Sequence, residues 1–204
     1  MSTFKAIAFA SAALLLAGCG SKADKEAPVK ADAAAPVTAD AQLAALDSEV
    51  ARLQTLAVND KQAIPEVLKA ESAFAAAREK CGAGADAKAC LVPLYAARAH
   101  ALREASAGAR AEDPKSISIG PLPLKCDGID ALISVSYLNA DPGVAYLTWG
   151  GDKSATLTQE ASGSGAKYGG KDASGTYSFW TKGDEAMLAL PGAAEAKCKF
   201  ETAG

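Results

Sequence analysis

The spacing of apolar residues changes once along this chain, and that change limits the folds open to it. From about residue 40 to residue 108, apolar side chains recur every three or four positions, as on one face of an amphipathic helix. From about residue 123 onward they alternate with polar residues in short runs that end at turn residues, as in β-strands. The sequence therefore predicts an α+β, two-domain chain, with a small helical hairpin or bundle followed by an antiparallel β-domain.

Three helical stretches are expected in the first region. Asp40 suits the N-cap of the first helix, and Pro65 lies near the first turn of the second, where proline is tolerated. Gly82 interrupts the second helix, and the third runs from about Ala87 to Ala107. We expect the apolar faces to pack a helical core rather than to hold a cofactor. The residues on these faces are Leu43, Leu46, Val50, Leu53, Ala57, Val67, Phe74, Ala77, Leu91, Tyr95, Arg98 and Leu102.

The second region consists of short alternating segments separated by turn residues. Residues 132–138 and 144–149 alternate, and residues 139–143, Asn-Ala-Asp-Pro-Gly, form a turn between them. Further short segments follow as far as Phe200, with a glycine- and serine-rich loop at 162–168. Such a succession predicts an antiparallel sandwich or barrel.

Two stretches with the composition of linkers frame the helical region. Residues 19–39 contain mostly Ala, Lys, Asp and Pro and lack aromatic residues, which predicts a disordered tether. Residues 109–122 contain Pro114 and Pro121 and predict a linker. The expected organisation is a signal peptide at 1–18, a tether at 19–39, a helical domain at 40–108, a linker at 109–122 and a β-domain at 123–204.

The N-terminal segment resembles a bacterial lipoprotein signal. Lys5 precedes an apolar run at 6–16 that is too short to span a membrane, and small residues at 17 and 18 lead directly into Cys19, as in a lipobox. The resemblance implies cleavage before Cys19, a diacylglycerol on its sulfur and an acyl chain such as palmitate on the new amino group. The alternative is an ordinary signal peptide with an incidental cysteine.

The lipid would decide where the protein resides. One acyl chain gives only marginal membrane binding, whereas several hold a protein stably. In lipoprotein sorting, Asp after the cysteine favours the inner membrane, and this chain has Gly20 and Ser21. We therefore expect a protein anchored by its N-terminal lipid to the outer membrane and facing the periplasm.

Four cysteines remain besides Cys19, and an exported protein meets an oxidising environment in which disulfides form. Four cysteines allow three pairings. Cys81 and Cys90 flank a short loop in the helical region, whereas Cys126 and Cys198 flank the β-region. We favour the non-overlapping pairs Cys81–Cys90 and Cys126–Cys198.

The residue patterns of common catalytic and metal sites are missing. The single histidine, His100, excludes a multi-histidine metal cluster and argues against a Ser-His-Asp triad, and the cysteine spacings are not those of zinc sites. No nucleotide-binding or GxSxG motif occurs, and a net charge of −3 without a basic stripe argues against nucleic acid. We expect a binding protein rather than an enzyme, with no metal, cofactor or small-molecule substrate. His100 itself is expected to be a packed or solvated helix residue.

Three ordered motifs mark the β-region. They are Lys-Cys-Asp-Gly at 125–128, Ser-Gly-Ser-Gly-Ala-Lys-Tyr at 162–168 and Phe-Trp-Thr-Lys-Gly-Asp-Glu-Ala at 179–186, and Cys198 follows near the end. Over about residues 123–201 this pattern resembles the MliC/PliC family, bacterial inhibitors of c-type lysozyme. The resemblance implies an eight-stranded antiparallel β-barrel whose two cysteines are bridged.

The same resemblance implies a lysozyme-binding site. A c-type lysozyme cleft contains a protonated glutamate and an ionised aspartate. Lys182 offers a charged donor and Ser164 a hydroxyl that could reach them, and Gly165 lets the backbone approach the cleft wall. Tyr168 and Trp180 either brace the loop or contact the partner. Without the resemblance, Ser164 and Lys182 would be an ordinary turn residue and an exposed hairpin lysine.

The helical region carries a second pattern: Leu43-Ala44-Ala45-Leu46-Asp47, then Glu71, Phe74, Arg78, Cys81, Cys90, Tyr95, Arg98 and Leu102. This pattern resembles LprI-like proteins, which are also linked to lysozyme inhibition. Glu71 and Phe74 stand where that family usually has Gln and Trp, and its leading cysteines are missing. The resemblance implies a similar helical fold.

Together these features predict a lipoprotein that blocks the substrate cleft of c-type lysozyme with a Ser-Gly-x-x-Tyr loop and a hairpin lysine. The alternative is an envelope lipoprotein with a structural role, or one that binds peptidoglycan or another protein through the helical domain. Because every inhibitor motif lies within it, the fragment from Ile117 to Gly204 is expected to keep most of the inhibitory activity.

Overall fold

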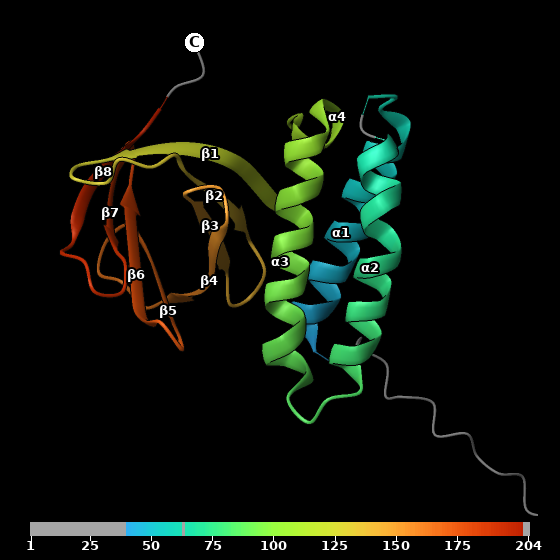
Figure 1. Cartoon of the computed structure of the whole chain (residues 1–204), viewed down its shortest axis with the longest axis horizontal. Coiled ribbons are helices and arrows are strands. Elements are labelled where there is room, and N and C mark those ends of the chain that lie inside the picture. Colours follow the sequence, from blue (N-terminus) through green and yellow to red (C-terminus); the bar gives the residue numbers. More distant parts are fainter. Residues whose placement is uncertain (1–39, 63, 202–204) are drawn as a thin grey trace, which may run out of the picture. The chain divides into compact units, whose positions relative to one another are not determined.

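The computed structural model describes residues 40–62 and 64–201, and in them helices precede strands (Figure 1). The helices are α1 (Ala41–Asn59), α2 (Ile64–Gly82), α3 (Ala87–Ala105) and α4 (Ala107–Arg110). The strands are β1 (Ser118–Cys126), β2 (Ile133–Leu138), β3 (Val144–Trp149), β4 (Lys153–Glu160), β5 (Ala166–Asp172), β6 (Gly175–Lys182), β7 (Glu185–Ala189) and β8 (Ala196–Phe200). This order confirms the α+β fold class.

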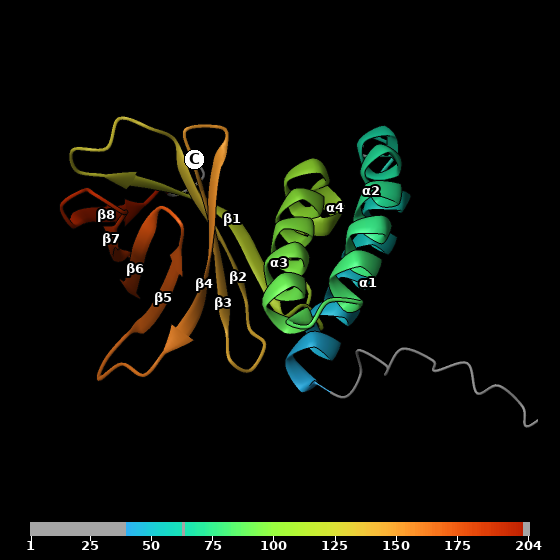
Figure 2. The same ribbon diagram turned by 60° about the horizontal axis from the view of Figure 1, so that its bottom comes forward.

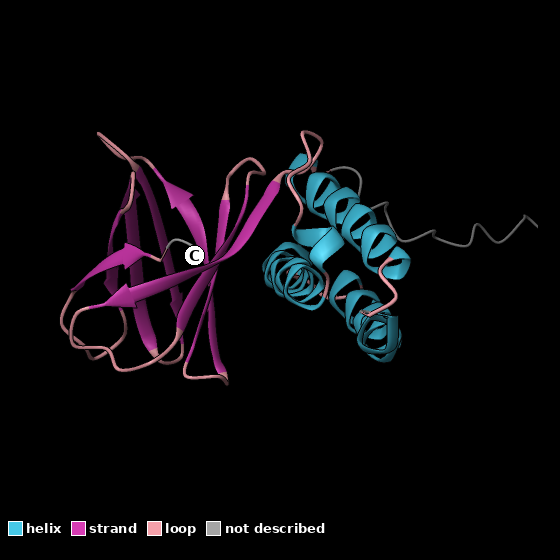
Figure 3. Cartoon of the chain, turned by 90° about the horizontal axis from the view of Figure 1, so that it is seen from above, coloured by secondary structure: helices cyan, strands magenta, loops and turns pink. Residues whose placement is uncertain are grey.

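The strands form a closed antiparallel barrel in which each strand pairs with the next and β8 pairs with β1 (Figure 3). Cys126 and Cys198 lie opposite each other at the β1–β8 seam, and a disulfide joins them. Inside the barrel, the aromatic rings of Tyr137, Tyr168 and Phe179 pack against one another. The eight-stranded barrel implied by the family resemblance is therefore present.

The helix ends follow the expected local chemistry. Asp40 is the N-cap of α1, and its carboxylate accepts a hydrogen bond from the backbone N–H of Leu43 at 3.1 Å. Helix α2 has Pro65 in its first turn and ends at Gly82. The second disulfide, Cys81–Cys90, links α2 to α3 across the short loop, as the favoured pairing required.

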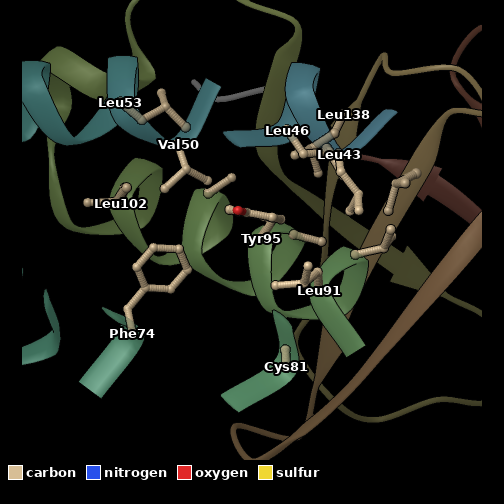
Figure 4. Close-up of a cluster of buried hydrophobic side chains, with 14 of the residues drawn as sticks. Leu43, Leu46, Val50, Leu53, Phe74, Cys81, Leu91, Tyr95, Leu102 and Leu138 are labelled. Carbon is tan, nitrogen blue, oxygen red and sulfur yellow. The ribbon is translucent and has the colours of Figure 1, made fainter. Parts of the chain in front are cut away.

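The apolar helix faces form one buried cluster (Figure 4). Its most deeply buried large side chains come from α1 and α3; they are Leu46, Leu53, Leu91, Tyr95 and Leu102. Leu138 of β2 and Val144 of β3 belong to the same cluster, and both are fully buried. The helical core thus continues onto the β2–β3 hairpin.

Polar side chains complete this junction between helices and barrel. Glu49 of α1 is 3% exposed and accepts a hydrogen bond from the hydroxyl of Ser118. Arg103 of α3 is 5% exposed and donates to the carbonyl oxygen of Gly120 at 2.6 Å. Both partners belong to β1, so the start of this strand is fixed by the helices.

The junction explains a difference from the expected linker at 109–122. Helix α4 extends to Arg110 and β1 begins at Ser118, so residues 111–117 alone form the irregular connection. The strand starts early because side chains of α1 and α3 bind Ser118 and Gly120. These contacts join residues distant in sequence, so the spacing of apolar residues did not predict them. The barrel therefore begins before the expected boundary at residue 123.

The expected signal peptide, the lipid-bearing Cys19 and the tether at 19–39 lie outside the described residues. Within the described ranges, none of the helices combines the length and the apolar character that crossing a membrane would require.

Candidate functional site

Two of the three sequence motifs, those at 162–168 and 179–186, meet at one end of the barrel. The loop at 161–165 connects β4 to β5, and the turn at 183–184 connects β6 to β7. Strands β5 and β6 are antiparallel neighbours, with Ala166 opposite Thr181 (Figure 2). The fold therefore brings the loop that carries Ser164 next to the strand end that carries Lys182.

Gly165 shows how closely the loop and β6 approach. Its φ is +68°, in the left-handed region that glycine adopts readily. A Cβ atom at this position would lie 3.2 Å from both Cε2 of Trp180 and Cβ of Lys182, and it would also collide with the carbonyl oxygen of Thr181. The close packing of the loop on β6 therefore requires glycine at position 165, even without a partner.

Ser164 and Lys182 are both exposed. The backbone carbonyl of Ser164 is held twice, by the indole N–H of Trp180 at 2.9 Å and by the hydroxyl of Ser162 at 2.7 Å. The Ser164 hydroxyl and the Lys182 ammonium group make no hydrogen bond or ion pair with the residues that the structure describes. This end of the barrel thus offers two adjacent donors to a partner.

Tyr168 lies inside the barrel. It is 6% exposed, and its ring centroid lies 5.6 Å from that of Tyr137 and 6.4 Å from that of Phe179. Burial raises the pKa of its hydroxyl. A side chain this buried supports β5 and the adjoining loop, and it reaches the surface only at the hollow described below. The lysozyme-binding role of Tyr168 stays a prediction.

The sequence left the role of Trp180 open, and the structure shows where its side chain lies. It alternates with the inward-facing Tyr177 and Phe179, so it lies on the outer wall of the barrel, partly exposed. From there its indole reaches the loop and binds the Ser164 carbonyl. The alternation along β6 could have predicted the outward direction, but not the bond to a residue sixteen positions earlier.

A hollow of about 440 Å³ opens beside the same turn. Tyr137, Tyr168 and Thr181 lie along one part of it, and Gly183 and Asp184 form another part of its wall. Lys182 therefore lies between two residues of the wall of this hollow, Thr181 and Gly183.

One comparison finds a family to which this part of the chain is similar. Residues 125–197 match the family model of MliC, the membrane-bound lysozyme-inhibitor of c-type lysozyme. The MliC-matched region extends from the end of β1 into β8 and includes Ser164, Trp180 and Lys182. No curated protein and no solved structure matched the chain.

The match supports the resemblance to MliC for the barrel and does not include the helices. MliC is an inhibitor family whose name implies membrane attachment and c-type lysozyme as the protein partner. The resemblance of the helical region to LprI-like proteins stays a prediction.

The residues behind that second resemblance form one network among α1, α2 and α3. Asp47 accepts a hydrogen bond from the Tyr95 hydroxyl at 3.0 Å and pairs with Arg78 at 3.1 Å. Burial, with a smaller contribution from Asp47, raises the pKa of Tyr95 to about 12. Arg98 pairs with Glu71 at 2.8 Å. These contacts join the helices to one another, which is a structural role.

No cluster of metal-ligating side chains occurs among residues 40–62 and 64–201. The four disulfide-bonded cysteines are engaged with one another in pairs. The features that this part of the chain offers to a partner are thus the loop at 161–165, Lys182 and the adjoining hollow.

Proposed function

We propose that the barrel end that carries Ser164 and Lys182 inhibits c-type lysozyme by occupying its substrate cleft. The match of residues 125–197 to MliC supports the class of partner. The observation that carries the proposal is the close approach of the loop next to Ser164 to Lys182, together with the exposure of both side chains, whose hydroxyl and ammonium groups are not bonded to other described residues.

The chemistry of the cleft suits these two donors. The ionised aspartate of a c-type lysozyme accepts a charge-assisted hydrogen bond from an ammonium group, and such bonds are stronger than neutral ones. The Ser164 hydroxyl can donate to either carboxyl group of the cleft. Occupation of both carboxyl groups would leave the substrate without its acid and its nucleophile.

We also propose that the protein acts from a membrane, attached by a lipid on Cys19 at the outer membrane and facing the periplasm. The lipobox-like sequence before Cys19 supports this attachment, and the description of the matched family as membrane-bound agrees with it. Mass spectrometry of the mature N-terminus tests it, because an unmodified Cys19 would contradict the proposal.

The inhibition experiment compares variants in a cell-wall lysis assay with c-type lysozyme and a soluble form from Gly20 to Gly204. Loss of a buried interfacial partner of a charge typically costs ~2–5 kcal/mol. Lys182→Ala should therefore weaken inhibition at least tenfold, and Ser164→Ala should weaken it by a smaller factor.

Matched controls exist at the opposite end of the barrel. Lys153 and Ser154 begin β4 and are both exposed. Lys153→Ala and Ser154→Ala should leave inhibition unchanged. If Lys182→Ala and Ser164→Ala bind lysozyme as tightly as the parent, with unchanged circular dichroism, the cleft-blocking proposal is wrong.

A further inference from the structure

The loop at 161–165 has the composition of a flexible segment, yet its backbone is held in place. Ser-Gly-Ser-Gly sequences behave as flexible coils when nothing binds them. Here two donors converge on one acceptor, the carbonyl oxygen of Ser164: the Trp180 indole N–H at 2.9 Å and the Ser162 hydroxyl at 2.7 Å. The loop conformation thus depends on a side chain from another strand.

The next residue limits the loop further. Gly165 packs so closely on β6 that an added Cβ would meet Trp180, the Thr181 backbone and Lys182. By contrast, a Cβ at Gly163 would have no atom within 4 Å. The hold is therefore local to Ser164 and Gly165, the two residues that face β6.

We propose that Trp180 is a positioning residue for inhibition, which fixes the Ser164 backbone so that the Ser164 hydroxyl stands at a set place beside Lys182. The proposal rests on the proposed function and names a residue that acts through another. Lys182 is already fixed by its strand, whereas Ser164 lies in a loop. Ordering a loop upon binding reduces affinity, and a loop that is held beforehand avoids that loss.

A direct contact between Trp180 and lysozyme is the competing explanation, because exposed tryptophans are frequent hot spots in interfaces. The two roles differ in how Trp180 and Ser164 combine. A positioning residue loses its effect once the hydroxyl that it positions is gone, whereas a direct contact contributes independently.

The test uses Trp180→Phe, which keeps a large aromatic ring and removes the N–H donor. Trp149→Phe is the matched control, since Trp149 is the other tryptophan and packs on Tyr177 through its ring. A neutral hydrogen bond contributes about 0.5–1.5 kcal/mol net. Trp180→Phe should therefore weaken lysozyme binding by about two- to tenfold, and Trp149→Phe should leave it unchanged.

The double variant separates the two roles. In the Ser164→Ala background, Trp180→Phe should weaken binding less than twofold. An equal fold-loss in both backgrounds would assign Trp180 to direct contact and overturn the positioning role.

Measurements on the free protein keep this result distinct from a failure of the proposed function. In Trp180→Phe, the amide hydrogens of residues 163–165 should exchange faster with solvent, while those of β6 exchange as in the parent. Unchanged loop exchange would overturn the inference even if lysozyme is inhibited. Failure of the parent to bind lysozyme would overturn the proposed function, and with it the role of Trp180 in inhibition, even if Trp180→Phe changes the loop exchange as expected.

The parent protein supplies a test that needs no variant. The indole N–H of Trp180 is bonded, whereas that of Trp149 has no hydrogen-bond partner among the described residues. The Trp180 indole hydrogen should therefore exchange more slowly than that of Trp149. Equal rates would contradict the bond on which the proposal depends.

Discussion

Nδ1 of His100 on α3 lies 2.8 Å from Oγ of Ser136 on β2, and this hydrogen bond joins the helices to the barrel. The imidazole also packs on Tyr146 of β3, with 5.1 Å between ring centroids, and His100 is only 5% exposed. The sequence predicted that His100 is either packed or solvated, and the structure shows that it is packed. The sequence predicted His100 on a helix outside the β-region, whereas in the structure His100 lies at the junction between the helices and the barrel.

His100 makes the stability of the junction depend on pH. Burial lowers its pKa below the ordinary value of 6.5, although nearby Glu104 acts in the opposite direction. The unfolded chain then binds the proton at a higher pH than the folded one, so this contribution is complete above 6.5 and is lost as pH falls through the folded pKa. In urea unfolding at pH 7.5 and 5.5, His100→Asn should show a smaller difference between the two pH values than the parent. Identical pH dependence in both proteins would contradict this role.

Glu49 also makes the stability of the protein depend on pH, in a lower pH range than His100 does. Burial alone would raise its pKa, but hydrogen bonds from Arg52, Ser118 and Ser116 outweigh burial and hold it below the ordinary value of 4.5. Its contribution is therefore complete above 4.5 and is lost as pH falls through the lower folded pKa.

Glu49→Gln should reduce the free energy of unfolding at pH 7 by about 1.5–3 kcal/mol, the range for hydrogen bonds to a charged group. The same substitution at the exposed Glu79 of α2 is the control and should have little effect. The loss at Glu49 should shrink below pH 4.5, as measured by denaturant titration. A loss that is constant with pH would mean that the charge of Glu49 is unimportant.

The two glycines of the loop at 161–165 should respond differently to alanine. Gly165→Ala forces a Cβ against the Thr181 carbonyl at a positive φ, so the loop must move. Gly163→Ala adds a methyl group to open space. We expect inhibition to fall about tenfold or more for Gly165→Ala and to change little for Gly163→Ala, in the same lysis assay. Equal effects of the two substitutions would argue against a fixed loop.

The barrel without its helices should be less stable than it is in the whole chain. A fragment from Ile117 to Gly204 exposes Leu138 and Val144, which are fully buried in the whole chain. Burial of each such side chain contributes about 1.5–3 kcal/mol. The fragment should unfold at a lower temperature by calorimetry. It should still inhibit lysozyme where it is folded, because both Ser164, in the β4–β5 loop, and Lys182, at the end of β6, lie within it. An unchanged unfolding temperature would mean that the junction adds no stability.

The fold was predictable to the extent that it depends on local pattern. Periodic apolar spacing gave the three long helices, Asp40 gave the first helix start, and alternation gave the short strands. Spacing along the chain also indicated both disulfides. The barrel closure and the site residues came from a family resemblance, because alternation alone does not distinguish a sandwich from a barrel.

What the sequence by itself determined is therefore the order of helices and strands, which is a property of residues close together, and the cysteine pairs, since two cysteines flank a short loop in the helical region and two flank the β-region. The two candidate donors stay a prediction from an ordered motif. Only the tertiary structure decided that Tyr168 is buried, that Trp180 holds the Ser164 carbonyl and that His100 bonds to Ser136. Each of these facts depends on strand register or on helix packing against the barrel. The physical reason is that such contacts join residues distant in sequence, and no local pattern encodes which of them will meet.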